Sequence, residues 1–361
     1  MGKYIVKRLL LIIPTLFLIL LTNFAIVQSA PGGPVEQKIS QIEAEQKQGA
    51  TQTQLSTTTY QGSRGLSPDM VEAIKKQYGF DKSALERFWL MLTSYAKGDF
   101  GTSLFKGKPV GELILDKMPV SISLGLWSTL LIYLIAVPLG IAKARRHNSL
   151  MDKTTALLLA VSYAVPVFVL AVVLLVMLAG GSYWQIFPLQ GLVSENFDKL
   201  STFGKIKDYF WHLALPITAS TIGGFAGLAY LTKFSFMEEL NKQYVLTARS
   251  KGLSEKKVLY GHVFRNAMMI IIAGLPSAIV GIFFTGNFLI EVIFNLDGLG
   301  RLGFEAIGQR DYPVIFGTLF IFTLMGLILQ LISDVTYHLI TGCKHRTHKR
   351  IDGFFIGKRG R

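Results

Sequence analysis

Long apolar runs alternate with polar stretches along this chain of 361 residues. Six of the runs contain no Asp, Glu, Lys or Arg, and each exceeds the roughly 18 residues that a helix needs to cross a bilayer. They are residues 9–30, 118–142, 154–180, 212–232, 266–290 and 312–333. The pattern predicts an all-α polytopic membrane protein with six transmembrane helices.

The charged residues between these runs orient the chain. If the N-terminus and residues 143–153, 233–265 and 341–361 share one side, that side carries 21 Lys and Arg against 5 acidic residues. The other side carries 16 basic and 17 acidic residues. Because basic loops stay in the cytoplasm, we expect the first side, with both termini, to be cytoplasmic. This topology explains the net charge of +14, so no nucleic-acid partner is expected.

The apolar N-terminal run is expected to remain as the first span, because it is too long for the core of a signal peptide. Four parts follow from these boundaries. They are an N-terminal transmembrane helix (1–30), an external segment (31–117), a transmembrane core (118–340, with the loop 233–265) and a basic cytoplasmic tail (341–361).

The external segment is far longer than a usual connection between helices. Residues 36–65 are rich in Gln, Ser and Thr, which predicts a mobile stretch. Residues 70–78 are expected to form a short amphipathic helix, and the capping box at 83–86 starts a second one. Its aromatic stripe is expected either to pack on the protein's own membrane-facing surface or to dock a soluble partner.

The loop 233–265 is predicted to form a helix, a glycine break and a second helix. Residues 238–251 are good helix formers, and Gly252 follows where a left-handed residue ends a helix without a steric clash. Ser254 is then a natural N-cap for a helix through Arg265. The segment could rest on anionic lipid or receive a partner. A DNA-binding helix-turn-helix is disfavoured because membrane spans flank it.

One pattern suggests a dinucleotide site and another a metal site, but neither has the sequence context that such a site requires. The string from Gly298 to Gly303 matches G-x-G-x-x-G, yet no strand precedes it, so we expect a tight external turn. The sequence contains no P-loop for ATP. Cys343, His345 and His348 lie in a basic tail without a fourth ligand, so no metal site is expected.

Two acidic residues, Glu291 and Asp334, border the predicted spans. We expect them to anchor helix ends and to form internal hydrogen bonds, because a carboxylate at membrane depth needs partners. Prolines are also expected to interrupt four spans and to allow bends. These are Pro138, Pro166, Pro216 and Pro276.

The segment 244–254, together with His262 and residues 265–267, resembles the cytoplasmic coupling segment of permeases in the peptide/nickel family of ABC importers. That segment has the form E-A-A, three residues, then G. Gly252 occupies the glycine position, and the two small positions are Thr247 and Ala248. Leu246 stands at the Glu position, a departure that is common among peptide permeases.

Further stretches that resemble B-type permeases of this family run through most of the chain. They are residues 7–10, 13–14, 30–34, 98–103, 119–124, 212–216 and 297–300. Within the family the chain most resembles Yej-type B subunits, which are associated with oligopeptides and microcin C. This resemblance rests on residues 78–81, 208–212, 281–294 and 310–313. One departure is the tail, where residues 341–349 replace the usual Asp-Pro-Arg-Ile motif.

The resemblance implies a type I (MetI-like) importer permease fold with an enlarged first periplasmic segment. It implies a subunit that moves oligopeptides, and peptide-type microcins, across the bacterial inner membrane. The implied partners are a C-type permease subunit, ABC ATPase subunits that bind ATP and Mg²⁺, and a periplasmic peptide-binding protein. The chain itself is then not an enzyme and holds no cofactor.

The resemblance also places the contact with the ATPase. The residues it assigns to this contact are Tyr244, Val245, Thr247, Ala248, Arg249, Gly252 and Leu253. An alternative is a proton-coupled secondary peptide carrier. Such a carrier is expected to hold acidic residues near the middle of the membrane, and the predicted spans contain none there.

Overall fold

The computed structural model describes residues 2–29, 82–180, 183–284 and 288–356. The predicted mobile stretch at 36–65 and the predicted helix at 70–78 lie outside the described residues. Within the described part the regular structure is helical, and the only extended pairing is an isolated bridge between Thr102 and Pro109. The prediction of an all-α chain is confirmed.

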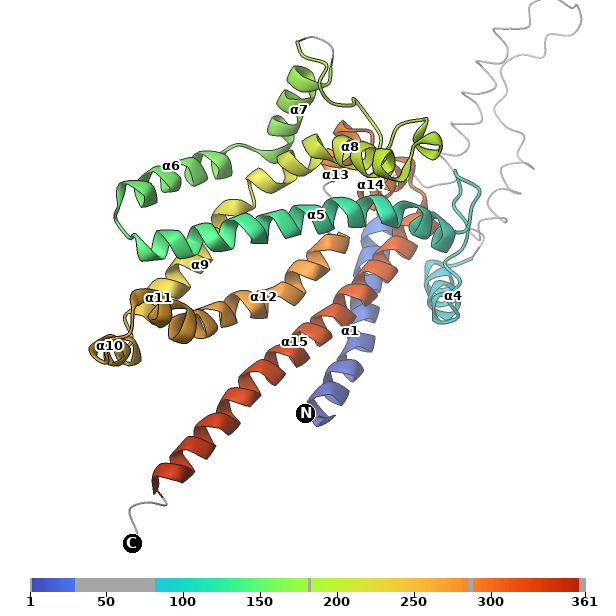
Figure 1. Cartoon of the computed structure of the whole chain (residues 1–361). Helices are drawn as coiled ribbons and strands as arrows, with labels where there is room; N and C mark the ends of the chain where they lie inside the picture. The colour runs from blue at the N-terminus through green and yellow to red at the C-terminus, as the bar shows by residue number, and fades with distance from the viewer. Residues whose placement is uncertain (1, 30–81, 181–182, 285–287, 357–361) are drawn as a thin grey trace, which may run out of the picture. The chain divides into compact units, whose positions relative to one another are not determined.

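The helices follow one another along the whole described chain (Figure 1). The longest are α1 (Gly2–Ser29), α5 (Val110–Arg145), α12 (Phe264–Phe284) and α15 (Tyr312–Ile356). The α-helices of intermediate length are α4 (Ala84–Ala96), α6 (Leu150–Ala164), α7 (Val167–Leu178), α8 (Thr202–Ile222), α9 (Phe225–Leu240) and α14 (Leu299–Gln309). The shortest elements are η1 (Phe197–Lys199, 3₁₀), α10 (Gln243–Ser250), α11 (Glu255–Val258), η2 (Leu259–Val263, a π-helix) and α13 (Phe288–Ile293).

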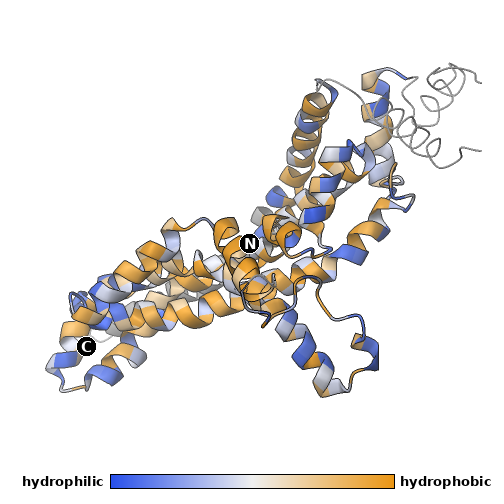
Figure 2. Ribbon diagram, turned by 90° about the horizontal axis from the view of Figure 1, so that it is seen from above, coloured by the Kyte–Doolittle hydropathy of each residue, from blue (hydrophilic) through white to orange (hydrophobic). Residues whose placement is uncertain are grey.

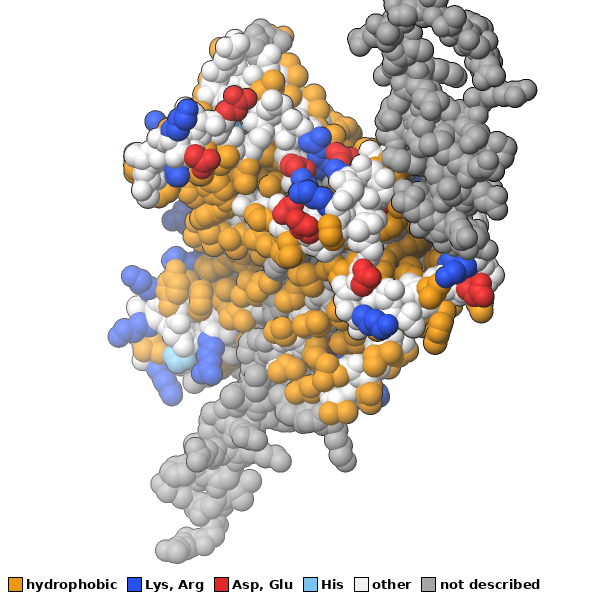
Figure 3. Space-filling view, turned by 90° about the vertical axis from the view of Figure 1, so that its right-hand side faces the viewer, with side chains coloured by type: hydrophobic (Ala, Val, Ile, Leu, Met, Phe, Trp, Pro, Cys, Tyr) orange, Lys and Arg blue, Asp and Glu red, His pale blue; other side chains and the backbone are white. Residues whose placement is uncertain are grey.

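Among the described residues, four stretches are long and apolar enough to cross a membrane. They are Ile5–Ser29, Val110–Arg145, Glu255–Ile279 and Tyr312–Val335. Two further candidates are bent pairs: α6 with α7 at 90°, and α8 with α9 at 51°. Counting each bent pair as one span gives the six that the sequence predicts. Hydrophobic residues dominate most of these helices (Figure 2), and apolar side chains cover much of the described part of the face that Figure 3 shows.

The positions of the bends differ in part from the prediction. Helices α5 and α8 continue through Pro138 and Pro216, so the expected interruption at these two prolines is wrong. The bend between α6 and α7 does fall at Pro166, which lacks an N–H and cannot continue the preceding helix. The bend between α8 and α9 falls at Gly223 and Gly224 instead.

The chain divides into two compact units. Unit 1 contains Met1–Leu9, Lys117–Arg301 and Met325–Arg361, and unit 2 contains Leu10–Asp116 and Leu302–Leu324. In unit 2 the capping box of α4 is formed, since the Ser83 Oγ accepts from the Glu86 N–H and the Glu86 carboxylate accepts from the Ser83 N–H. Two aromatic residues of α4 are buried: Phe88 contacts two rings of α1, and Tyr95 contacts a ring of α15. This part of the stripe therefore packs on the protein itself.

In unit 1, helices α5 and α9 approach each other closely at Gly140. A Cβ atom at this position would lie 2.5 Å from the Thr232 Cβ and 2.6 Å from the Ala229 carbonyl oxygen. Backbone oxygen cannot move aside as a flexible side chain can. Only glycine therefore fits at this crossing of the two helices.

Replacing Gly140 with valine is expected to lower the free energy of unfolding by about 1–3 kcal/mol, because overpacking forces the two helices apart. The measurement is thermal unfolding of the detergent-purified protein. Gly227→Val on α9 is the matched control, since a Cβ atom there has no neighbour within 4 Å. Equal loss of stability in both variants would contradict the close approach.

Glu291 on α13 is fully buried and is held by hydrogen bonds. Its carboxylate accepts from the Ser121 hydroxyl at 2.7 Å and from the Arg301 N–H at 2.8 Å. The Ser121 Oγ in turn accepts from the Leu299 N–H at 2.8 Å. Ser121 and Glu291 thus accept from N–H groups in the first turn of α14. These N–H groups have no carbonyl partner within the helix itself. Internal hydrogen bonding of Glu291 is confirmed.

The glycine string at 298–303 is not the tight turn that we expected. It begins at Gly298 and continues into the helix α14. A Cβ atom on Gly298 would lie 2.4 Å from the Glu291 Cδ, so glycine leaves room for the buried carboxylate. The second acid, Asp334, is paired with Arg8 at 2.8 Å, in keeping with an anchoring role at the end of a span.

Candidate functional site

The segment between α9 and α12 forms a separate short helix, α10, rather than the continuous helix expected from 238 to 251. Helix α9 ends at Leu240, and Lys242 is extended (φ −77°, ψ 150°) before α10 starts at Gln243. The break turns Val245 and Ala248 toward the protein core, and burial of these residues outweighs the helix propensity of the sequence.

The end of α10 agrees with the prediction for Gly252, whose φ is +77°. The Gly252 N–H donates to the Arg249 carbonyl at 2.9 Å, and the Leu253 N–H donates to the Ala248 carbonyl at 3.4 Å. These two bonds form a Schellman motif, which requires a left-handed residue at the glycine position. The backbone of Ser254 is extended as an N-cap, but its side chain makes no capping hydrogen bond.

After Ser254 the chain enters α11, passes through the π-helix η2 and continues as α12. The second predicted helix is therefore the start of a span, not a separate element that ends at Arg265. Within this stretch Val258 and Val263 are both fully buried.

One face of α10 is packed against the rest of unit 1. Val245 is 0% exposed and Ala248 is 6% exposed. Their neighbours in this buried cluster come from four other elements of the chain. They are Ile141 and Ala144 of α5, Phe236 of α9, Val258 of α11, Leu259 and Val263 of η2, and Ala267 and Ile271 of α12. Tyr244 and Leu253 pack partly against the same cluster.

Polar contacts fix both ends of α10. The Tyr244 hydroxyl donates to the Glu239 carboxylate at 2.6 Å and accepts from the Asn266 side chain at 3.3 Å. Burial and the hydrogen bond to the carboxylate raise the pKa of Tyr244, so the phenol stays a neutral donor at physiological pH. At the other end, Arg249 pairs with Glu255 through two hydrogen bonds of 2.8 and 3.1 Å across the glycine turn.

The opposite face of α10 is exposed. Leu246, an apolar residue, is 56% exposed there, beside Thr247 and Arg249. Gly252 is also exposed, and a Cβ atom on it would meet nothing within 4 Å. Exposed lysines precede and follow α10 in the sequence, at Lys242, Lys251, Lys256 and Lys257. We call Leu246, Thr247, Arg249 and Gly252 the outer face of α10.

The structure therefore separates the seven predicted contact residues into three groups. Thr247, Arg249 and Gly252 lie on the outer face, and Val245 and Ala248 are buried against their own chain. Tyr244 and Leu253 are partly buried. Val245 and Ala248 are thus inaccessible in the isolated chain, and the contact of this segment with an ATPase stays a prediction. Leu246 was not among the predicted contacts, because sequence spacing does not show which of two adjacent apolar residues is buried.

No group of three His, Cys, Asp or Glu side chains among the described residues is placed to hold a metal ion. The tail residues Cys343, His345 and His348 fall where the structure does not describe side chains. Among the described residues, the candidate site therefore consists of α10, which is packed on one face and exposed on the other, and contains no metal-binding group of side chains.

Comparisons with known proteins connect this arrangement with transport. Residues 136–341 match the family model described as binding-protein-dependent transport system inner membrane component. An inner membrane ABC transporter permease protein, YejB of Escherichia coli O157:H7, is 53% identical over 94% of this chain and 98% of its own length. A peptidoglycan transport system permease protein, YejB of Agrobacterium fabrum, is 50% identical over 93% and 96%. An oligopeptide transport system permease protein, AppB of Bacillus subtilis, is 31% identical over 94% and 98%.

Proposed function

Because this chain belongs to the binding-protein-dependent transport system inner membrane component family, we propose that it is the permease subunit through which an ATP-driven importer moves oligopeptides. The chain is a multi-pass subunit of an inner-membrane ABC transporter and is not itself an enzyme. Membership implies an ABC ATPase, a substrate-binding protein and a second permease subunit as partners. We further propose that the second permease subunit is of the C type, that both termini are cytoplasmic, and that peptide-type microcins are additional substrates.

The helix α10 is the observation that carries the proposal. It is short, lies between two candidate spans, and combines a buried face with an exposed one. A helix that is rigidly mounted on several spans can pass a displacement of a few ångströms to all of them at once. The outer face of α10 is thus suited to dock on the ATPase, while the buried face passes the movement to α5, α9 and α12.

Peptide uptake tests the proposal directly. Cells that lack this chain are expected to lose accumulation of labelled oligopeptides and sensitivity to a peptide-type microcin, and the intact gene should restore both. Reconstituted transport should require ATP and the substrate-binding protein. Uptake driven by a proton gradient without ATP would instead support the secondary carrier.

Gly252→Trp is expected to uncouple ATP hydrolysis from uptake while the chain still enters the membrane. The indole would project from the outer face of α10, and a left-handed backbone costs a residue with a Cβ atom about 1 kcal/mol. Uptake per ATP hydrolysed in proteoliposomes measures the effect. Gly252→Asn is the control, since Asn tolerates this backbone conformation and adds little bulk. Unchanged uptake and assembly in the Trp variant would refute docking at this position.

A further inference from the structure

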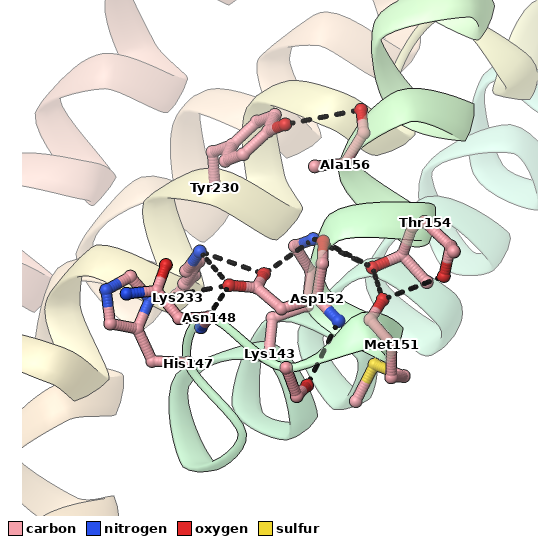
Figure 4. A network of polar contacts seen from close by, with 11 residues as sticks. Lys143, His147, Asn148, Met151, Asp152, Thr154, Ala156, Tyr230 and Lys233 are labelled. Carbon is pink, nitrogen blue, oxygen red and sulfur yellow. Dashed lines mark hydrogen bonds and ion pairs between the residues drawn. The ribbon is translucent and has the colours of Figure 1, made fainter.

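Three charged side chains are buried together in unit 1 (Figure 4). Lys143 comes from α5 and is 0% exposed, Asp152 comes from α6, and Lys233 comes from α9. We call these three residues the Asp152 cluster. Buried charges are unfavourable unless they are paired and hydrogen-bonded, so the geometry of the cluster decides what it can do.

Asp152 is the centre of the cluster and has a full set of partners. The Lys233 Nζ donates to both carboxylate oxygens, at 2.9 and 2.7 Å. The Lys143 Nζ lies 2.9 Å from Oδ1, and the Asn148 N–H donates to Oδ2 at 3.1 Å. The half-exposed His147 places its Nδ1 3.4 Å from Oδ2. Because both carboxylate oxygens are fully hydrogen-bonded, Asp152 holds α5, α6 and α9 together at one point.

The two lysines hold different parts of the structure. Lys143 also donates to the Asp152 carbonyl at 2.7 Å and to the Thr155 hydroxyl at 2.8 Å, so it closes the local turn between α5 and α6. Lys233 is 81 positions from Asp152 in the sequence and joins α6 to α9. Without Lys233, Asp152 would keep a buried cation at Lys143. The link to α9 can therefore be removed without leaving an unpaired buried charge.

Neighbouring contacts reinforce the link between α6 and α9. The Tyr230 hydroxyl on α9 donates to the Ala156 carbonyl on α6 at 3.5 Å, and the Lys143 Nζ lies 5.7 Å from the centre of the Tyr230 ring. One turn further along α6, Leu159 is buried with Ala226 and Ala229 of α9. The charged link thus lies at one end of a packed interface between the two helices.

The same helix α9 supports α10. One turn after Lys233, Phe236 is fully buried in the cluster that contains Val245 of α10. The Ser235 hydroxyl donates to the Ala267 carbonyl of α12 at 2.7 Å. Helix α9 is therefore tied to α10 and α12 on one side and, through Lys233, to α6 on the other.

We infer that Asp152 and Lys233 are positioning residues for transport, which make α6 move as one body with α9 and the docking helix α10. This inference rests on the proposed function, because it assumes that the ATPase displaces α10. The displacement then reaches α6 and, through the bend at Pro166, α7. Without the ion pair, α9 can move while α6 stays behind.

Lys233→Met separates this role from a purely structural one. The variant keeps the length of the side chain and the pair between Asp152 and Lys143, so it should accumulate in the membrane and assemble normally. Peptide uptake per ATP hydrolysed is expected to fall about tenfold in proteoliposomes, while the ATPase rate is maintained. Lys233→Arg should restore coupling, because a guanidinium can also bind both carboxylate oxygens. Lys153→Met, at an exposed position of α6, is the matched control.

Distance measurements test the inference even if a substitution prevents assembly. Spin labels are attached to cysteines at two exposed positions, Tyr163 on α6 and Leu231 on α9, with Cys343 replaced by serine. In the assembled transporter with the native Asp152 cluster, the distance between the labels is expected to stay the same with and without ATP. In the Lys233→Met background the distance should shift or broaden when ATP is added.

Two results obtained with an assembled transporter would overturn the inference, and a third concerns assembly itself. One is a change in the label distance on ATP addition with the cluster intact, and the other is full coupling in Lys233→Met. If the proposed transport function itself is wrong, the result is distinguishable, because the transporter without substitutions would then show no ATP-driven uptake at all. A loss of both assembly and ATPase activity in Lys233→Met, with no rescue by Lys233→Arg, would mark a role in folding alone and would also overturn it.

Discussion

Leu246→Asp is expected to abolish ATP-driven peptide uptake while the protein remains in the membrane in normal amounts. Leu246 lies on the outer face of α10 and is 56% exposed, so an aspartate there does not disturb the packing of the chain itself. If the leucine enters an apolar pocket of the ATPase, the substitution buries an unpaired carboxylate at the interface. Hot-spot truncations commonly cost 2 kcal/mol or more, and a buried charge adds to that cost. We expect binding of the ATPase to weaken by about thirtyfold or more.

Copurification of the ATPase with the tagged permease and uptake in proteoliposomes measure this effect. The matched control is Leu189→Asp, which makes the same chemical change at a leucine that is 51% exposed outside α10. The control should keep the ATPase and its uptake. Normal copurification of the ATPase with Leu246→Asp would exclude the outer face of α10 as the contact.

Gly298→Ala is expected to destabilise the permease strongly, and its effect should depend on Glu291. The added methyl group would lie 2.4 Å from the Glu291 Cδ and would displace the carboxylate from the Ser121 hydroxyl and the Arg301 N–H. Overpacking costs about 1–3 kcal/mol, and the loss of hydrogen bonds to a buried charged group adds about as much again. Peptide uptake should fall with stability, since the start of α14 loses its cap.

A double-mutant cycle identifies the cause. Glu291→Ala alone should also destabilise, because buried N–H groups lose their acceptor. In the Glu291→Ala background, however, Gly298→Ala should have little further effect, since the clash is gone. Thermal unfolding of the four proteins gives the interaction energy, which we expect to exceed about 1 kcal/mol. Additive effects would show that the contact between these two residues does not limit stability.

The sequence alone predicts the membrane architecture well, because bilayer thickness leaves a strong pattern of apolar runs. It also predicts the conformation of Gly252, since only a few residue types fit a left-handed helix end. In both cases the physical constraint is local: it acts on consecutive residues or on a single backbone position. The capping box at Ser83 and Glu86 belongs to the same class.

Features that depend on contacts between distant residues could not be predicted. The division of α10 into a buried and an outer face follows from its contacts with α5, α9 and α12, so spacing alone did not show that Val245 is buried within the chain. The bend at Gly223 arises between helices whose packing the sequence does not display. Likewise, Lys143 and Lys233 follow different apolar runs in the sequence, and only the fold brings both to Asp152.

The π-helix η2 contains one residue more than an α-helix would need to connect the same buried faces. Buried residues Val258 and Val263 are five positions apart across η2, whereas Val263, Ala267 and Ile271 follow at intervals of four. The wider turn takes up one residue more than an α-helix would, and the buried faces before and after it still line up. A chain that is one residue shorter between 258 and 263 would form a continuous α-helix and bury the same faces. Deletion of one residue at this point is therefore expected to leave the orientation of the span relative to α10 unchanged.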